Sequence, residues 1–340
     1  EDCIDALHQA YLDLASGTAV TRQRTDSLVS SGDFIYGLKT MDGIDSRLGM
    51  GAVRINSDIL TWPKIGSTHR RVKVPAATGN RYTGLILLFS IKTGEPLAVM
   101  PDGVIQRMRV GATSAIGTSY LARTDARMAA VVGTGWQAGA QLMGLAIVRP
   151  DIEIIRVFSP NVDNVRKFCK EWGRRMRQTF VPTESLAEAI QKCAVVLCAT
   201  SSIDPIFQLD HFEYGMHVGS IKPPEISPAC LEAADIVAVH FLHRKPGLIK
   251  ATGLVIPDHS DTRGWETSDK YDFSASPTLP ELISGTVGGR SGNTQRTCFV
   301  NDLGLGLQFA TVAGLAYEYA RAVGLGTEMP TELFTQSEHP

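Results

Sequence analysis

One short stretch constrains the fold of this chain more than any other. It runs Ala129-Ala130-Val131-Val132-Gly133-Thr134-Gly135-Trp136-Gln137-Ala138-Gly139, so an apolar, β-rich run ends on closely spaced glycines. In such a stretch the first glycine permits a tight turn from strand to helix, and the second lets backbone amides approach phosphate oxygens. A small third residue, here Ala138, lets the helix pack on the strand. The stretch therefore predicts that a dinucleotide pyrophosphate rests on a helix N-terminus, although an ordinary glycine-rich turn is the alternative. The predicted cofactor contacts in this turn are Gly133, Thr134, Gly135, Trp136, Gln137 and Ala138.

The next apolar run, Ile154 to Phe158, ends where a dinucleotide fold places the residue that reads the adenosine ribose. An acidic residue there would accept hydrogen bonds from the 2′-hydroxyl of NAD, but Ser159-Pro160-Asn161 supplies none. Arg166 follows one or two helical turns later, which leaves room for a 2′-phosphate. We therefore predict NADP in preference to NAD, with Ser159, Pro160, Asn161 and Arg166 in the site. Alternatively, Ser159 caps the next helix and Arg166 is a solvated surface charge.

Composition excludes several other classes of protein. The formal net charge is -2 and no block of Lys or Arg occurs, which argues against a nucleic-acid partner. No run of about 18 apolar residues suggests a membrane span. The six cysteines show no CxxC pair and no clustering with histidine, so we expect no metal site. Their scattered, apolar settings favour a reduced, cytoplasmic location.

The order of expected elements predicts two domains. Residues 2–17 fit an amphipathic helix, short β-rich runs between 34 and 100 predict a mostly antiparallel sheet, and residues 104–123 fit a second helix. From 129 onward strands and helices alternate, which is typical of a parallel, doubly wound sheet. A small-residue helix over 304–324 is expected to pack back on the first domain. The predicted fold class is thus α/β, with a Rossmann-type doubly wound parallel sheet over 113–302 and a second α+β domain built from both chain ends, 1–112 and 303–340.

Several spaced motifs resemble one family. They are Thr93-Gly94-Glu95-Pro96-Leu97-Ala98, Arg109-Val110-Gly111-Ala112-Thr113-Ser114-Ala115, the glycine stretch with Gln137-Ala138, Gly215-Met216-His217-Val218-Gly219, and the region from Gly289-Arg290 to Gly304. Together they are similar to the ornithine cyclodeaminase and mu-crystallin family over most of the chain. The resemblance implies a Rossmann domain inserted into a substrate-binding and dimerisation domain, a homodimer, and chemistry with NAD or NADP at the α-carbon of small amino or imino acids.

The resemblance also implies which residues bind the substrate carboxylate. Arg109 matches the family's carboxylate-binding arginine, and a planar guanidinium grips a carboxylate with two hydrogen bonds. Thr113, one turn on, is expected near the cofactor phosphate or the substrate. The position of the family's lysine falls on Arg54, which can clamp an anion but serves poorly as a general base. Lys73 is the rival for that position, and a solvated strand face is the alternative reading for it.

One departure from the family bears on the reaction. Ornithine cyclodeaminases carry an aspartate shortly after the strand that corresponds to 217–219, where this chain has Ser220-Ile221-Lys222-Pro223-Pro224-Glu225. Glu225 matches the family's following, structural glutamate better. We expect Ser220, together with Thr200 and Ser201 after the preceding apolar strand, to line the cofactor site at the carboxyl edge of the sheet.

The leading hypothesis is an NAD(P)-dependent oxidoreductase that transfers hydride to or from the α-carbon of a small imino or amino acid, with Arg54, Arg109 and Lys73 as the residues that act on the substrate. The first alternative is ornithine cyclodeaminase, in which bound NAD is regenerated while ornithine becomes proline and ammonia. The second alternative is a non-catalytic binder of NADP and a small ligand, like the crystallin branch of the family.

Overall fold

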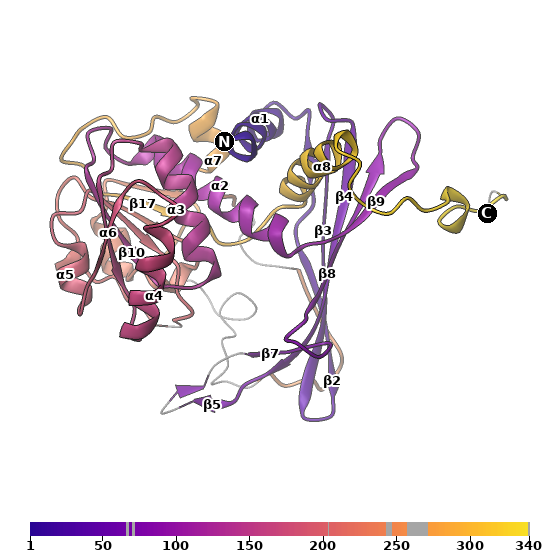
Figure 1. Cartoon of the computed structure of the whole chain (residues 1–340), viewed down its shortest axis with the longest axis horizontal. Coiled ribbons are helices and arrows are strands. Elements are labelled where there is room, and N and C mark those ends of the chain that lie inside the picture. Colours follow the sequence, from indigo (N-terminus) through magenta and orange to yellow (C-terminus); the bar gives the residue numbers. More distant parts are fainter. Residues whose placement is uncertain (66–67, 70–71, 203, 243–246, 257–270, 339–340) are drawn as a thin grey trace. The chain divides into compact units, whose positions relative to one another are not determined.

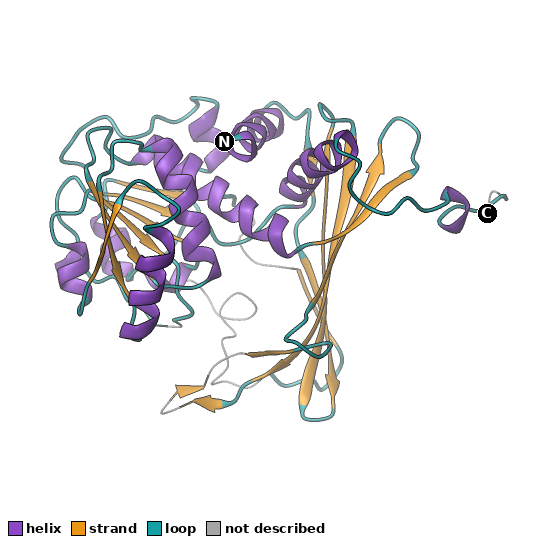
Figure 2. Ribbon diagram, in the orientation of Figure 1, coloured by secondary structure: helices purple, strands orange, loops and turns teal. Residues whose placement is uncertain are grey.

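The chain forms two compact units, each with its own sheet (Figures 1 and 2). The computed structural model describes residues 1–65, 68–69, 72–202, 204–242, 247–256 and 271–338. The first unit comprises Glu1–Leu12, Arg107–Leu242 and Asp269–Asp302, and the second comprises Asp13–Gln106, His243–Ser268 and Leu303–Pro340. The first twelve residues belong with the first unit because their side chains bond within it, as Tyr11 does to Thr113.

A seven-stranded parallel sheet forms the centre of the first unit. Its strand order is β12-β11-β10-β13-β14-β17-β15, and every neighbouring pair is parallel. The strands are β10 (Met128–Val132), β11 (Ile154–Phe158), β12 (Thr179–Pro182), β13 (Val195–Cys198), β14 (His217–Ser220), β15 (Ile236–Val239) and β17 (Thr297–Val300). The first strand of this sheet in chain order, β10, lies in its interior, and later strands are added on both sides of it. The sheet is therefore doubly wound. The predicted Rossmann-type sheet is confirmed. We did not predict β12 or β17, which are only four residues long.

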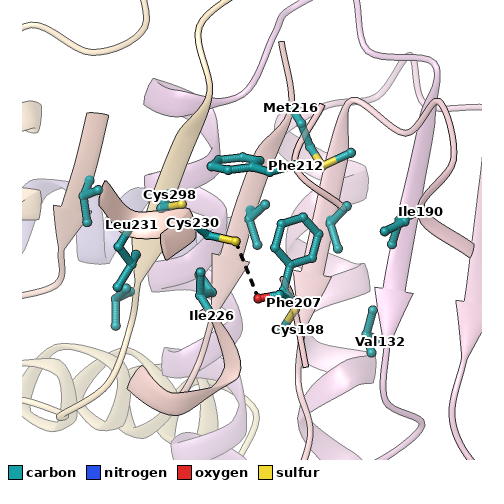
Figure 3. Packing of buried hydrophobic residues seen from close by; sticks show 14 of the residues in the cluster. Val132, Ile190, Cys198, Phe207, Phe212, Met216, Ile226, Cys230, Leu231 and Cys298 are labelled. Atoms are coloured by element: carbon teal, nitrogen blue, oxygen red, sulfur yellow. Dashed lines mark hydrogen bonds between the residues drawn. The ribbon is translucent and has the colours of Figure 1, made fainter. Parts of the chain in front are cut away.

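Apolar clusters bury both faces of this sheet. On β10, Ala130 and Val132 belong to one cluster, and Ala129 and Val131 belong to the other. Figure 3 shows the first cluster, in which Phe207 packs among strand residues such as Cys198. Burial on both faces explains why the strands read as continuous apolar runs rather than alternating ones. The helical segments that belong wholly or mainly to this unit are α1 (Asp2–Ala15), α2 (Gly103–Leu121), α3 (Trp136–Val148), α4 (Val162–Trp172), α5 (Leu186–Ile190), η1 (Leu209–His211), η2 (Pro223–Glu225), α6 (Pro228–Ala233) and α7 (Leu279–Ile283).

The second unit is built on a twisted, mostly antiparallel sheet. Its main order is β16-β2-β3-β4-β8-β9, with β1 beside β3 and β7 beside β4, and only the β16–β2 pair is parallel among the described strands. The strands are β1 (Val20–Thr21), β2 (Thr25–Ser31), β3 (Phe34–Asp45), β4 (Met50–Thr61), β7 (Val72–Val74), β8 (Thr83–Ser90), β9 (Pro96–Pro101) and β16 (Gly247–Lys250), and a separate pair is formed by β5 (Lys64–Ile65) and β6 (Thr68–His69). Among the β-rich runs expected between 34 and 100, residues 66–67 and 70–71 lie outside the described part of the chain.

One face of this sheet, which we name the inner face, is covered by α8 (Gly306–Ala322). Phe309, Ala310 and Ala313 of α8 pack in one cluster with strand residues such as Met41 and Ile86. The helix approaches closely because two glycines face each other: a Cβ on Gly306 would overlap the backbone of Asp42, and one on Gly43 would overlap Leu307. The expected helix over 304–324 is thus observed with slightly narrower bounds. A last turn, η3 (Thr331–Leu333), follows near the C-terminus.

In the described ranges, no helix combines the length and the apolar composition that crossing a bilayer requires.

Candidate functional site

Gly133 makes the turn between β10 and α3. Its φ is +112°, a backbone conformation that side-chain-bearing residues rarely adopt. A Cβ there would also overlap the carbonyl oxygen of Ala199, at the end of β13. The Gly133 amide donates to the carbonyl of Phe158, at the end of β11, with an N···O distance of 2.8 Å. Gly133 therefore lies between the ends of β11 and β13, the strands on either side of β10, as expected for a tight turn.

Gly135 caps α3 with extended backbone and no side-chain hydrogen bond. A Cβ on Gly135 would meet no atom within 4 Å, so the space in front of this helix N-terminus is open. Behind it, Ala138 is fully buried against the sheet. The first-turn amides of α3 thus point into open space that suits an anion such as a pyrophosphate.

Trp136 and Gln137 flank this open space. Trp136 is 59% exposed, and the guanidinium of Arg107 lies 3.8 Å from the centre of its ring. The Gln137 side-chain oxygen is buried and accepts no hydrogen bond from the described residues. An unmet buried acceptor beside a helix N-terminus is unusual, since buried polar groups are normally paired. A bound ligand that donates to Gln137 would satisfy it.

At the end of β11, Asn161 is the N-cap of α4, because its side-chain oxygen accepts from the Asn164 amide at 2.9 Å. The residue that caps the helix is therefore Asn161, not Ser159, which was the sequence alternative. The Ser159 side chain makes no hydrogen bond in the described part of the structure, and Arg166 is exposed on the following turn. The edge thus offers a hydroxyl and a guanidinium but no carboxylate between 159 and 161.

Glu225 ties together the ends of β13 and β14. Its carboxylate accepts from the Thr200 amide at 2.6 Å, the Thr200 hydroxyl at 2.8 Å and the Ser220 hydroxyl at 2.8 Å. The Ile221 amide donates to the same carboxylate at 3.1 Å. Burial raises the pKa of Glu225, although these donors oppose the effect. Glu225 positions Thr200 and Ser220 at the sheet edge and, with four donors already bound, has little capacity left to activate a substrate amine.

The helix α2 lies against the carboxyl ends of β15 and β17. Thr113 is fully buried, and its hydroxyl lies 2.9 Å from that of Tyr11, which in turn lies 2.7 Å from Nε2 of His240, the residue after β15. Asn301, after β17, donates to the Ser114 hydroxyl at 2.9 Å. Arg109 is on the same helix and only 3% exposed. The residues that follow β15 and β17 thus lie at the same edge as Thr113 and Ser114 of α2.

In the second unit, polar residues occupy inward positions of the sheet between two apolar clusters. We name this set the polar band; it consists of Lys39, Arg54, Asn56, Asp58, Lys73 and Asp102. One flanking cluster contains Met41 and Ile86, and the other contains Leu28 and Leu60. The inner face of a sheet normally carries apolar side chains that pack in the core. Polar side chains at these positions indicate a candidate functional site.

Asp102 fixes the orientation of Arg54. Its Oδ2 accepts a hydrogen bond from Nε of Arg54 at 2.7 Å and lies 2.6 Å from Nη2 in an ion pair. Asp102 fits there because Gly84 on β8 has no side chain; a Cβ on Gly84 would overlap the carboxylate. The Nη1 group of Arg54 makes no hydrogen bond within the described residues. One edge of a fixed, buried guanidinium is therefore left for another acceptor, such as a ligand carboxylate.

Asp58 joins two lysines in the same band. Its Oδ2 accepts from Lys39 Nζ at 2.6 Å, and its Oδ1 accepts from Lys73 Nζ at 2.8 Å. Lys73 also donates to Asn56 Oδ1 at 3.0 Å. Burial would raise the pKa of Asp58, but the two ammonium groups more than offset it and hold the pKa below its usual value. Lys73 thus bonds to buried members of the polar band, while its own side chain is 43% exposed.

The structure brings the predicted residues together in two groups. Residues 133–138, Thr200 and Ser220 share the carboxyl edge of the first unit's sheet, and Arg54 and Lys73 share the polar band of the second unit. Lys73 reaches Asn56, which is two residues beyond Arg54 on the same strand and face, so the two rivals for the family's lysine position are neighbours. Sequence analysis missed Tyr11, His240, Lys39, Asp58 and Asp102. The spacing Arg54-x-Asn56-x-Asp58, a polar alternation within a β-rich run, was the available signal.

Among the described residues, no group of three or more His, Cys, Asp or Glu side chains is arranged to hold a metal ion.

Comparisons with known proteins agree with this arrangement. A model of the ornithine cyclodeaminase/mu-crystallin family matches residues 68–324. A Delta(1)-pyrroline-2-carboxylate reductase of Bacillus cereus is 28% identical over 249 residues, which cover 72% of this chain and 73% of that protein. A protein of Sinorhizobium fredii named as an uncharacterized cyclodeaminase is 26% identical over 287 residues, which cover 82% of this chain and 79% of that protein. Among solved structures, that of Thermococcus litoralis Delta(1)-pyrroline-2-carboxylate reductase in complex with NADH and L-proline is 26% identical and aligns with a TM-score of 0.74, covering 96% of this chain and 95% of that one.

Proposed function

Because the chain belongs to the ornithine cyclodeaminase/mu-crystallin family, we propose that it is an NAD(P)-dependent oxidoreductase that transfers hydride to or from the α-carbon of a small imino or amino acid. Relatives named as Delta(1)-pyrroline-2-carboxylate reductases suggest a cyclic α-imino acid as the first substrate to test. When bound, the nicotinamide supplies or takes up the hydride.

The first unit is the proposed cofactor domain. Residues Gly133 to Ala138 would hold the pyrophosphate, since the space before Gly135 is open and the first-turn amides of α3 face it. Thr200, Ser201 and Ser220 would line the same edge beside the ribose and nicotinamide, and the fully buried Thr113 would support that edge from α2. The unmet oxygen of Gln137 fits a site that is completed by a ligand.

We propose NADP as the preferred cofactor. The support is the edge after β11, where Ser159 and Pro160 precede the capping residue Asn161 and no carboxylate stands to accept from a ribose 2′-hydroxyl. The exposed guanidinium of Arg166 would neutralise part of the charge of a 2′-phosphate.

The observation that carries the proposal is the free edge of Arg54 in the second unit. The Nη1 group of Arg54 has no acceptor among the described residues, as a site for a substrate carboxylate would require. Arg54 would grip this carboxylate through Nη1, and we retain Arg109 of the first unit as a second proposed ligand for it.

We further propose a homodimer that forms through the outer face of the second unit's sheet. The outward residues Phe34, Leu38 and Ile44 of β3 are 42%, 38% and 41% exposed, and Leu85 of β8 and Val99 of β9 are exposed apolar residues on the same side of the sheet. Exposed apolar side chains that share one sheet face are typical of a surface that a partner covers. We also propose a cytoplasmic location, because all six cysteines are free in the structure, as a reducing compartment would keep them.

The direct test is turnover of purified protein with Delta(1)-pyrroline-2-carboxylate and with a panel of α-keto acids plus amines, each with NADPH and NADH, followed by nucleotide absorbance. We expect net oxidation of the reduced nucleotide. Formation of proline from ornithine without net cofactor change would show a cyclodeaminase instead, and nucleotide binding without either reaction would show a non-catalytic binder.

The carboxylate clamp has its own test. Arg54→Met removes a charge-assisted hydrogen bond of about 2–3 kcal/mol, which raises KM for the imino acid roughly 30- to 150-fold. Arg22→Met, which changes an arginine that is 66% exposed in the same unit, is the matched control and should leave KM unchanged. An unchanged KM in the Arg54 variant would contradict the clamp.

A further inference from the structure

The pair of lysines on Asp58 is not explained by the carboxylate clamp. Arg54 already has Asp102 as its counter-ion, so neither lysine is needed to hold the clamp in place. Lys39 is only 5% exposed and Asp58 only 3%. Taking an ammonium and a carboxylate out of water costs several kcal/mol per ion, and apolar residues of similar size often stabilise such a position as well or better. We therefore expect the buried charges of Lys39 and Asp58 to have a role in the reaction.

The register of the strands places Lys39 next to the clamp. On the inner face of the sheet, Lys39 of β3 lies opposite Asn56 of β4, and Met41 lies opposite Arg54. Lys39 and Arg54 are therefore diagonal neighbours on one face, with Cβ atoms about 7–8 Å apart, within reach of long side chains. The nitrogen of an α-imino acid is separated from its carboxylate carbon by one carbon atom. A substrate whose carboxylate binds Arg54 would therefore carry its nitrogen on the sheet face that also holds Lys39.

Three charged groups face Lys39: Asp58 on β4, Lys73 on β7 and Arg24 just before β2. Burial lowers the pKa of Lys39 to about 8, because the charged form is desolvated and the attraction of Asp58 offsets only part of that cost. An ammonium that releases its proton near neutral pH suits general acid catalysis, in which the best donor has a pKa close to the working pH.

We propose that Lys39 is the general acid that protonates the substrate nitrogen, and that Asp58 and Lys73 return a proton to it from solvent. This inference rests on the proposed reductase function. As the α-carbon of the C=N bond gains hydride, its π electron pair moves to nitrogen and takes a proton from Lys39 Nζ. The products are a secondary or primary amine, oxidised nucleotide and neutral Lys39.

The geometry of Asp58 suits the return of the proton. Its two oxygens face different lysines, Oδ2 toward Lys39 and Oδ1 toward Lys73, so one carboxylate bridges both ammonium groups. Lys73 gives a proton to the Asp58 carboxylate, and the carboxyl group then turns and passes this same proton to neutral Lys39, so that Asp58 is again an anion. Lys73 is 43% exposed and regains its proton from water. Asn56 holds Lys73 in this position and is a positioning residue.

The deciding variant is Lys39→Arg. It keeps the positive charge beside Asp58, so folding is retained, but a guanidinium does not release its proton at working pH. We expect kcat for imine reduction to fall about 10²- to 10⁴-fold with KM nearly unchanged. We also expect the wild-type decline of kcat above a pH of about 8 to disappear. Lys73→Met should lower kcat but keep that decline, because Lys39 is still the donor. Lys92→Met, at an exposed position of the same unit, is the control.

The outcomes separate the inference from the function on which it rests. If the wild-type protein reduces no imine, the proposed function fails and the inference fails with it. If the wild type is active and Lys39→Arg keeps its kcat and its alkaline decline, the inference alone is overturned. A measurement without turnover adds a second criterion: NMR of protein labelled at lysine Cε should show one signal that titrates near pH 8 and is missing from Lys39→Arg. A Lys39 signal that titrates above pH 10 would also overturn the inference.

Discussion

The same methyl group, added at two glycines only two residues apart, should have opposite effects on this protein. Gly135→Ala should leave the fold intact and weaken dinucleotide binding. Gly133→Ala should lower the stability of the first unit, whether or not the dinucleotide is present. The contrast follows from the surroundings, since a Cβ on Gly135 meets nothing within 4 Å whereas a Cβ on Gly133 overlaps the carbonyl of Ala199.

The expected magnitude for Gly133→Ala has two parts. At a φ of +112° a side-chain-bearing residue costs about 1–3 kcal/mol. The overlap adds to this cost because Ala199 has little freedom to move: its amide donates to the carbonyl of Val132 at 2.9 Å. A total of at least about 3 kcal/mol corresponds to a Tm that is lower by roughly 6–12 °C for a unit of this size. Gly135 has a φ of -86°, which alanine adopts readily, so we expect a change of Tm close to zero.

Thermal unfolding and NADPH binding would be measured on both variants and on the wild type. Quenching of Trp136 fluorescence reports binding, because this half-exposed ring lies beside the predicted phosphate position. For Gly135→Ala we expect an unchanged Tm and a Kd at least about tenfold higher, from a loss of about 1.4 kcal/mol or more. If that variant bound NADPH as tightly as the wild type, the α3 amides would not contact the phosphates. If Gly133→Ala were as stable as the wild type, the strain argument would be wrong.

Three further predictions concern other parts of the molecule. Arg166→Ala should lower kcat/KM for NADPH about tenfold and leave that for NADH unchanged, since only NADPH carries the 2′-phosphate; equal effects on both would refute the NADP assignment. Burial lowers the pKa of His217 to about 3, so an unfolded chain takes up a proton near pH 6.5 that the folded one does not, and stability falls with pH below 6.5 by at most about 1.4 kcal/mol per pH unit. His217→Gln should remove this slope in urea unfolding at pH 6.5 and pH 5, and an unchanged slope would contradict it. Leu38→Asp, on the outer sheet face, should convert a dimer to a monomer in light scattering after size exclusion, and a dimer that persists would place the interface elsewhere.

The first unit was predictable because local rules determine most of it. The run 129–132 is apolar because both faces of β10 are buried, and the glycines after it follow from a turn that no other residue fits. Its strands are neighbours in sheet order, so their carboxyl ends gather the expected cofactor residues at one edge. The two strands that were not predicted, β12 and β17, are no shorter than β13, β14 and β15, but polar residues flank them on both sides, Gln178 and Thr183 for β12 and Arg296 and Asn301 for β17.

The second unit was predicted less well because its sheet breaks the usual pattern. The strands β3 and β4 are twelve residues long, whereas the apolar pattern predicts only short β-rich runs in this part of the chain. The missing parts contain Lys39 and Asp58, which point inward but read in the sequence as residues of a solvated face. Which residues pair across strands is decided by register, and register is a property of the folded sheet. From the sequence, Arg54 and Lys73 were therefore alternative candidates for the position of the family's lysine. In the structure both belong to the polar band.

Buried arginines in the two units show how a structural charge differs from a functional one. In the first unit, Arg149 donates to five backbone carbonyls, among them those of Thr118 and Ala122 at the end of α2, so its guanidinium serves as a cap. Arg290 likewise bonds to four carbonyls and a hydroxyl. Such groups have little bonding capacity left for a ligand. Arg54 is as buried as Arg149 but binds one carboxylate, that of Asp102, and its Nη1 group has no acceptor among the described residues. Since a buried donor without an acceptor is unfavourable for folding, we attribute the retention of Arg54 to an anion that binds its Nη1 group during function.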